Sequence, residues 1–88
     1  MFRLWAREFK DNHMICDTVV ESDSDDTRTH KIMDALGEAC VRFDLARPIW
    51  LDTNIAEFKS TAKTRFRRDS FVEDIDFDYL EIQVIEED

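Results

Sequence analysis

The stretch Phe77 to Ile85, FDYLEIQVI, carries the strongest strand signal in the chain. Its apolar and polar side chains alternate, which predicts a β-strand with one buried face. Leu80, Ile82 and Val84 are expected on the buried face. The opposite face is expected to hold Tyr79, Glu81, Gln83 and Ile85.

Two further strands are predicted near the N-terminus, at residues 2–10 and 14–21, as a hairpin around Asp11, Asn12 and His13. A three-residue loop gives the register that best sorts the side chains. On one face this register pairs Leu4 with Val20, Ala6 with Thr18 and Glu8 with Cys16. On the other it pairs Arg3 with Glu21, Trp5 with Val19, Arg7 with Asp17 and Phe9 with Ile15.

Apolar residues at helical spacing predict two helices between these strands, at about residues 26–43 and 54–66. Ser24 is the expected N-cap of the first, and Asp52 or Thr53 that of the second. Pro48 separates them, and residues 49–51 are expected to form a short strand or an extended connection. The inward residues are expected to be Ile32, Leu36, Ala39, Cys40 and Phe43, and then Ile55, Phe58, Ala62 and Phe66.

The expected order is therefore β-β-α-(short β)-α-β in a single domain, residues 1–88. This order predicts an α+β two-layer sandwich, with both helices on one face of a mainly antiparallel sheet. The hydrophobic effect is expected to bury the sheet residues Leu4, Ala6, Cys16, Val20, Leu80, Ile82 and Val84 against the helices.

Helices on one face leave the other face of the sheet open, and large apolar side chains are expected there. Trp, Tyr and Arg dominate the hot spots of protein interfaces, and monomers rarely leave a large apolar patch in water. We therefore expect a protein interface or a homodimer through this face, with a simple solvated face as the alternative. The candidate residues are Trp5, Phe9, Ile15, Val19, Tyr79, Ile85, Arg3 and Arg7.

Charge is divided sharply along the chain. The net charge of −9 resides in the last twenty residues, which hold nine acids and no Lys or Arg. The preceding segment, residues 59–68, holds five bases and no acid and is a candidate for contact with an anion, including nucleic acid. Its bases are Lys59, Lys63, Arg65, Arg67 and Arg68. Alternatively, these bases complement the end of the second helix or are neutralised by the acidic segment.

The acidic balance disfavours general binding to nucleic acid or to anionic membranes. An acidic domain of this size also suggests a second nucleic-acid-related role, in which it mimics nucleic acid and occupies a basic groove on another protein.

Catalytic and metal-binding constellations are not expected. His13 and His30 lack zinc-ligand spacing, and Cys16 and Cys40 are expected to be reduced, buried thiols. An EF-hand-like spacing of acids that starts at Asp23 fails because Arg28 occupies the position that needs glycine. The alternating acids Asp74, Asp76 and Asp78 fit a solvated loop better than an acid–base pair. We therefore expect no cofactor, no metal and no enzyme activity.

Three stretches resemble an uncharacterised family of small acidic bacterial proteins. They are Ile49-Trp50-Leu51-Asp52, Glu57-Phe58-Lys59 and residues 75–88, IDFDYLEIQVIEED. The resemblance implies a free-standing bacterial protein and carries no activity. With no apolar run near the roughly 20 residues of a membrane span and no signal-peptide pattern, a cytoplasmic location is expected.

Overall fold

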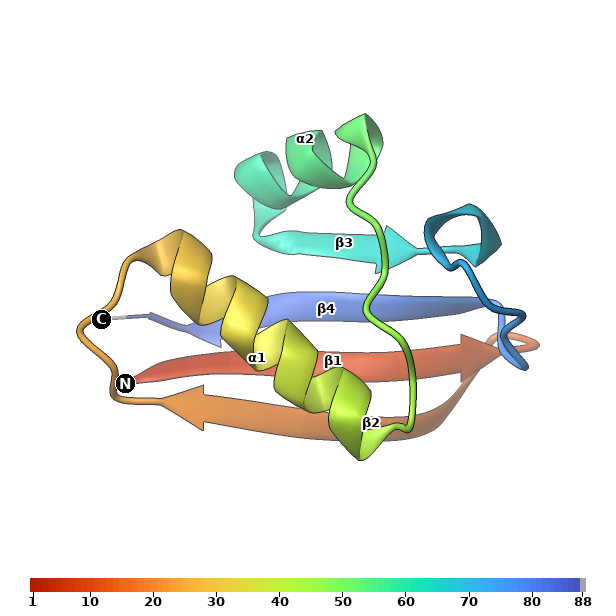
Figure 1. The fold of residues 1–88 in the computed structure, drawn as a ribbon, viewed down its shortest axis with the longest axis horizontal. Helices are drawn as coiled ribbons and strands as arrows, with labels where there is room; N and C mark the ends of the chain where they lie inside the picture. The colour runs from red at the N-terminus through yellow and green to blue at the C-terminus, as the bar shows by residue number, and fades with distance from the viewer. Residues whose placement is uncertain (88) are drawn as a thin grey trace.

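Four antiparallel strands form one open sheet in the order β2-β1-β4-β3, in a computed structural model that describes residues 1–87 (Figure 1). Two helices and a short 3₁₀ turn, η1, complete the fold. The elements are β1 (Phe2–Lys10), β2 (His13–Ser22), α1 (Arg28–Arg42), α2 (Asp52–Thr61), β3 (Lys63–Phe66), η1 (Arg68–Ser70) and β4 (Tyr79–Glu86). The predicted α+β class, with a mainly antiparallel sheet, is confirmed.

The position of the short strand differs from the prediction. Residues 49–51 form an extended connection, which was one of the two predicted alternatives, and Trp50 packs there edge-on against Phe58 and Phe66 at ring distances of 5.5 and 5.0 Å. The fourth strand is instead β3, which occupies the end of the helix predicted over 54–66. Helix α2 ends early because Ala62 adopts the left-handed conformation, with φ of 57°. Phe66 is buried, but it belongs to a strand and not to the predicted helix.

The predicted hairpin register is confirmed from Arg3–Glu21 to Glu8–Cys16, although the loop is shorter than predicted. The turn consists of Asp11 and Asn12, both with positive φ, which matches a two-residue type I′ turn. A register shift then leaves Ile15 as an extra residue, so Phe9 pairs with Met14 instead. The bulge thus restores the register that a three-residue loop would have produced.

Helix α1 crosses the sheet over β1 and β2 and buries the predicted apolar stripe (Figure 1). Its N-cap is Thr27, whose hydroxyl accepts a hydrogen bond from the His30 N–H at 3.2 Å. The prediction of Ser24 as N-cap was wrong, because Ser24 instead accepts from the Asp26 N–H within the preceding loop.

The core lies between the helices and alternate residues of the strands. Of the seven predicted sheet residues, Leu4, Ala6, Val20, Leu80 and Ile82 are buried, and Val84 packs partly buried against them. Cys16 is only half-buried. The inward prediction for Ile55 was wrong, because 40% of its surface is exposed on α2.

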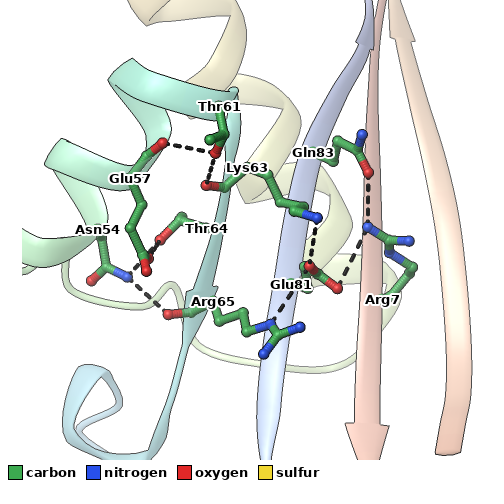
Figure 2. Close-up of polar contacts among 9 residues, drawn as sticks. All are labelled: Arg7, Asn54, Glu57, Thr61, Lys63, Thr64, Arg65, Glu81 and Gln83. Atoms are coloured by element: carbon green, nitrogen blue, oxygen red, sulfur yellow. Dashed lines mark hydrogen bonds and ion pairs between the residues drawn. The ribbon is translucent and has the colours of Figure 1, made fainter.

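Helix α2 also protects the outer edge of β3. The Asn54 side-chain amide donates to the Arg65 carbonyl at 2.8 Å, and the Thr61 hydroxyl donates to the Lys63 carbonyl at 3.2 Å (Figure 2). These bonds occupy edge carbonyls that would otherwise be available to another strand. The short strand is therefore fixed in place by the helix that precedes it.

Candidate functional site

The face of the sheet that turns away from the core is the candidate site, and the odd-numbered residues of β1 lie on it. Trp5 and Phe9 are half-buried there, as is Tyr79 on β4. Val19 is exposed on β2. Ile15 and Ile85 are exposed where the strand registers shift. We call this surface the open face. Its residues are Asp17, Val19 and Glu21 of β2, Arg3, Trp5, Arg7 and Phe9 of β1, Tyr79, Glu81 and Gln83 of β4, and Lys63 and Arg65 of β3.

A buried carboxylate organises the charges on the open face (Figure 2). Glu81 of β4 is only 4% exposed, and three bases surround it. Its oxygens lie 3.5 Å from Arg7, 3.6 Å from Arg65 and 3.8 Å from Lys63. Arg7 also donates to the Gln83 side-chain oxygen at 3.0 Å. A single acid thus holds three bases from two neighbouring strands.

The aromatic residues of the open face stack with the same bases. The Arg7 guanidinium lies 3.8 Å from the centre of the Trp5 ring, and the Trp5 indole donates to Asp17 at 2.9 Å. Arg65 lies 4.7 Å from the centre of the Tyr79 ring, which itself stacks on Phe9 at 5.1 Å. Charged stems therefore cover part of the apolar surface, and the rest remains accessible.

Arg3 of β1 contacts acids on both of its neighbouring strands. Arg3 lies 3.1 Å from Glu21 and 3.2 Å from Glu86, and Asp17 accepts from Trp5. Asp17 and Glu21 belong to β2 and Glu86 belongs to β4, whereas Arg3 and Arg7 belong to β1. Acids and bases therefore alternate from strand to strand across the open face.

The predicted basic segment does not form one cluster. Lys63 and Arg65 lie on β3 and belong to the open face, and Arg67 follows them with its guanidinium 5.9 Å from the Tyr79 ring centre. Arg68 starts η1, and Lys59 lies on α2 beside a separate hollow between the helices. The structure therefore joins three of the five bases to the predicted interface and leaves two apart.

A shallow groove of about 480 Å³ runs between α2 and β3. Lys63, Arg65 and Arg67 line it together with the hydroxyl residues Ser60, Thr61 and Thr64. The Thr64 hydroxyl already donates to Glu57 at 2.7 Å, and the Thr61 hydroxyl bonds to backbone carbonyls. The bases are therefore the groups in this groove that can attract an anion.

One partly buried pair lies on the core side of the sheet. The Cys16 thiol donates to the Glu8 carboxylate at 3.2 Å. Burial raises the pKa of Glu8, the Cys16 hydrogen bond lowers it, and the charge of Asp76 raises it. Burial, together with the same hydrogen bond, raises the pKa of Cys16 to about 11, so its thiol is not an activated nucleophile. Burial likewise raises the pKa of Cys40 to about 11.

Two properties bear on function within residues 1–87. No group of three or more His, Cys, Asp or Glu side chains in this range is placed to hold a metal ion. No helix in this range is long and apolar enough to cross a membrane.

Together, the fold and the open face define a small α+β sandwich with one helix-covered face and one charged, aromatic face. Comparisons of the chain with family models, with curated proteins and with solved structures found no match.

Sequence reasoning identified the residues of the open face but missed the central role of Glu81. It placed Glu81 on this face but did not predict its contacts with Lys63 and Arg65, because it assigned both bases to a helix. The alternation of Lys63, Thr64, Arg65 and Phe66 between exposed and buried positions is the signal that could have revealed the strand.

Proposed function

We propose that the chain is a non-enzymatic protein-binding module that uses the open face of its sheet. One observation carries the proposal. Trp5, Tyr79, Arg7 and Arg65 lie together, partly accessible, on a face that no element of residues 1–87 covers. Their side chains are preordered by stacking and ion pairs, which lowers the entropy that a partner's binding would cost.

The residue types support protein as the partner. Trp, Tyr and Arg contribute most of the energy in protein interfaces, and the exposed aliphatic residue Val19 lies beside Trp5 in the sheet. The bacterial family resemblance and the cytoplasmic location remain predictions, as does the role as a nucleic-acid mimic.

The proposal is tested by affinity capture with three tagged proteins: wild type, Trp5→Ala and Val41→Ala. Val41 is 79% exposed on α1, away from the open face, and serves as the matched control. Wild type and Val41→Ala are expected to retain the same partner, which can be the chain itself, and Trp5→Ala is expected to lose it. Circular dichroism must show that Trp5→Ala is folded. Equal retention by a folded Trp5→Ala would refute the proposal.

A nucleic-acid role is the second candidate, and the closeness of the Tyr79 ring to both Arg65 and Arg67 favours it. Aromatic rings beside bases on an open sheet are typical of single-strand binding surfaces. Fluorescence anisotropy with a labelled single-stranded oligonucleotide over a salt series tests it. The candidate requires binding that weakens with salt and that Arg67→Ala reduces, and absence of binding at low salt would remove it.

A further inference from the structure

One row of side chains alternates in charge across the whole sheet. Asp17 pairs in register with Arg7, Arg7 with Glu81, and Glu81 with Arg65. Because the strand order is β2-β1-β4-β3, the row reads acid, base, acid, base from one edge to the other. Figure 2 shows its Arg7, Glu81 and Arg65 members on neighbouring strands.

When a second copy of this row is placed over the first in reversed order, every acid lies opposite a base and every base lies opposite an acid. A two-fold axis that runs parallel to the strands, above the open face, reverses the order of the strands. Such an axis sets β2 of one copy over β3 of the other, and β1 over β4. Asp17 then faces Arg65 of the partner subunit, and Arg7 faces its Glu81.

We propose that the occupant of the open face is a second copy of this chain, related by this two-fold axis. The inference rests on the proposed function, because it names the partner of the same face. The axis perpendicular to the strands is disfavoured, since it places each charge of the row over its own equivalent and like charges repel.

The neighbouring residues fit the same arrangement. In register with the charged row lie Val19, Trp5, Gln83 and Lys63, and Phe9 pairs with Tyr79 beyond it. The rotation sets Trp5 over Gln83 of the second copy, and Phe9 over its Tyr79. A stacked aromatic pair thus meets the same pair in reverse order, which gives the interface an apolar contact at one end of the strands.

Burial determines what each member of the row contributes. In the single chain, only 13% of the Arg7 side chain and 5% of the Glu81 side chain are exposed, so dimer formation removes little further water from them. Asp17 and Arg65 lie on the outer strands, and the Arg65 side chain is 45% exposed. The Asp17–Arg65 pairs lie toward the rim, where charges set orientation more than affinity.

The available area sets the expected strength. The strands have 9, 10, 4 and 8 residues. With a rise of about 3.3 Å per residue and a strand spacing of about 4.8 Å, the face covers about 500 Å². Two such faces bury about 1,000 Å², which lies at the lower limit for a specific interface. We therefore expect a weak dimer, and the test must cover protein concentrations from about 1 µM to about 1 mM.

The test is a charge-swap experiment followed by sedimentation equilibrium. Asp17→Lys and Arg65→Glu each set like charges opposite each other at two symmetry-related places. Each is expected to raise the dimer Kd at least tenfold. An equimolar mixture of the two variants, and the double variant Asp17→Lys/Arg65→Glu, are both expected to recover association. Asp34→Lys and Lys59→Glu make the same charge changes on the helices and are expected to leave Kd within threefold. Circular dichroism checks that every variant is folded.

The outcomes separate this inference from the proposed function. A wild type that stays monomeric at about 1 mM overturns the proposal that a second copy binds the open face. In that case, loss of another partner by Trp5→Ala would still support the open face as a binding surface. A monomeric wild type that binds an oligonucleotide overturns it in favour of nucleic acid. A dimer that both folded single variants leave unchanged overturns the open face as the dimer interface. Single variants that weaken the dimer without recovery in the mixture and the double variant overturn the two-fold axis.

Discussion

Replacement of Glu81 by glutamine is expected to destabilise the protein by about 3 kcal/mol, because it removes the carboxylate that pairs with three bases while keeping the side-chain shape. The Arg7 contact dominates, since both side chains are nearly buried and their N···O distance is 3.5 Å. At an effective dielectric constant of about 20, this attraction is about 5 kcal/mol. The half-exposed Lys63 and Arg65 pairs add about 1 kcal/mol each or less.

The net loss is smaller than this total for two reasons. Glutamine avoids the cost of burying a charge, which is several kcal/mol for a carboxylate in a protein interior. Arg7 also keeps its hydrogen bond to Gln83. A net value of about 3 kcal/mol corresponds to a fall in Tm of roughly 12–24 °C for a domain of this size.

Urea denaturation of wild type, Glu81→Gln, Arg7→Gln and the double variant measures the effect and the coupling between the two residues. The coupling energy is expected to be about 2 kcal/mol. Glu38→Gln is the matched control, because Glu38 pairs with Arg42 on the exposed surface of α1 at 2.7 Å and should cost about 0.5 kcal/mol or less. A loss below about 1 kcal/mol for Glu81→Gln, or additive single effects, would refute the central role of this carboxylate.

Two further substitutions test the surroundings of the site. Glu8→Gln is expected to stabilise the protein at neutral pH and to flatten its pH dependence: the raised folded-state pKa of Glu8 favours folding below pH 4.5, and this contribution is lost as pH rises through the folded pKa. Urea midpoints from pH 4 to pH 8 measure this, and an unchanged slope would contradict it. Asn54→Ala is expected to cost about 2–4 kcal/mol, because the buried amide bonds to Thr64, to the Arg65 carbonyl and to the Leu51 N–H. Thermal unfolding measures this loss, and a change below about 1 kcal/mol would show that Asn54 does not hold β3.

The sequence predicted most of the sheet because hydrophobic alternation and cross-strand pairing act locally. The register from Arg3 to Glu8 followed from matching opposite charges and apolar pairs. The end of α2 could not be predicted in the same way. Its stop residue is Ala62 in a left-handed conformation, where glycine is the usual signal, and Phe66 fits a helical stripe that continues from Phe58. Tertiary contacts of Asn54 and Trp50 decide this boundary.

That boundary also decides the candidate site. If Arg65 belonged to a helix, as predicted, the acidic and basic segments would be neighbours in sequence, and the sequence would not show whether they contact each other in space. With Arg65 on β3, Glu81 pairs with bases from both adjacent strands, and the alternating row is complete. Other acids of the C-terminal segment have separate contacts: Glu86 and Glu87 pair with Arg3 and Arg28, and Asp78 accepts from the Asp11 N–H. Asp88 lies outside the described residues.

The alternating row gives the protein two properties that a weak, specific interface needs: a monomer that is stable in water and a single favoured orientation of the second copy. Within one chain, each inner charge already has an opposite neighbour, so the monomer is stable with the open face in water. Between two chains, reversed order is the arrangement that sets every charge of the row against its opposite. Association then adds the apolar contacts of Trp5, Phe9 and Tyr79 without leaving a charge buried and unpaired. A wrong orientation places like charges opposite each other on every strand and is therefore unfavourable. In the proposed dimer, the charge pattern therefore selects the geometry, and the aromatic residues supply the affinity.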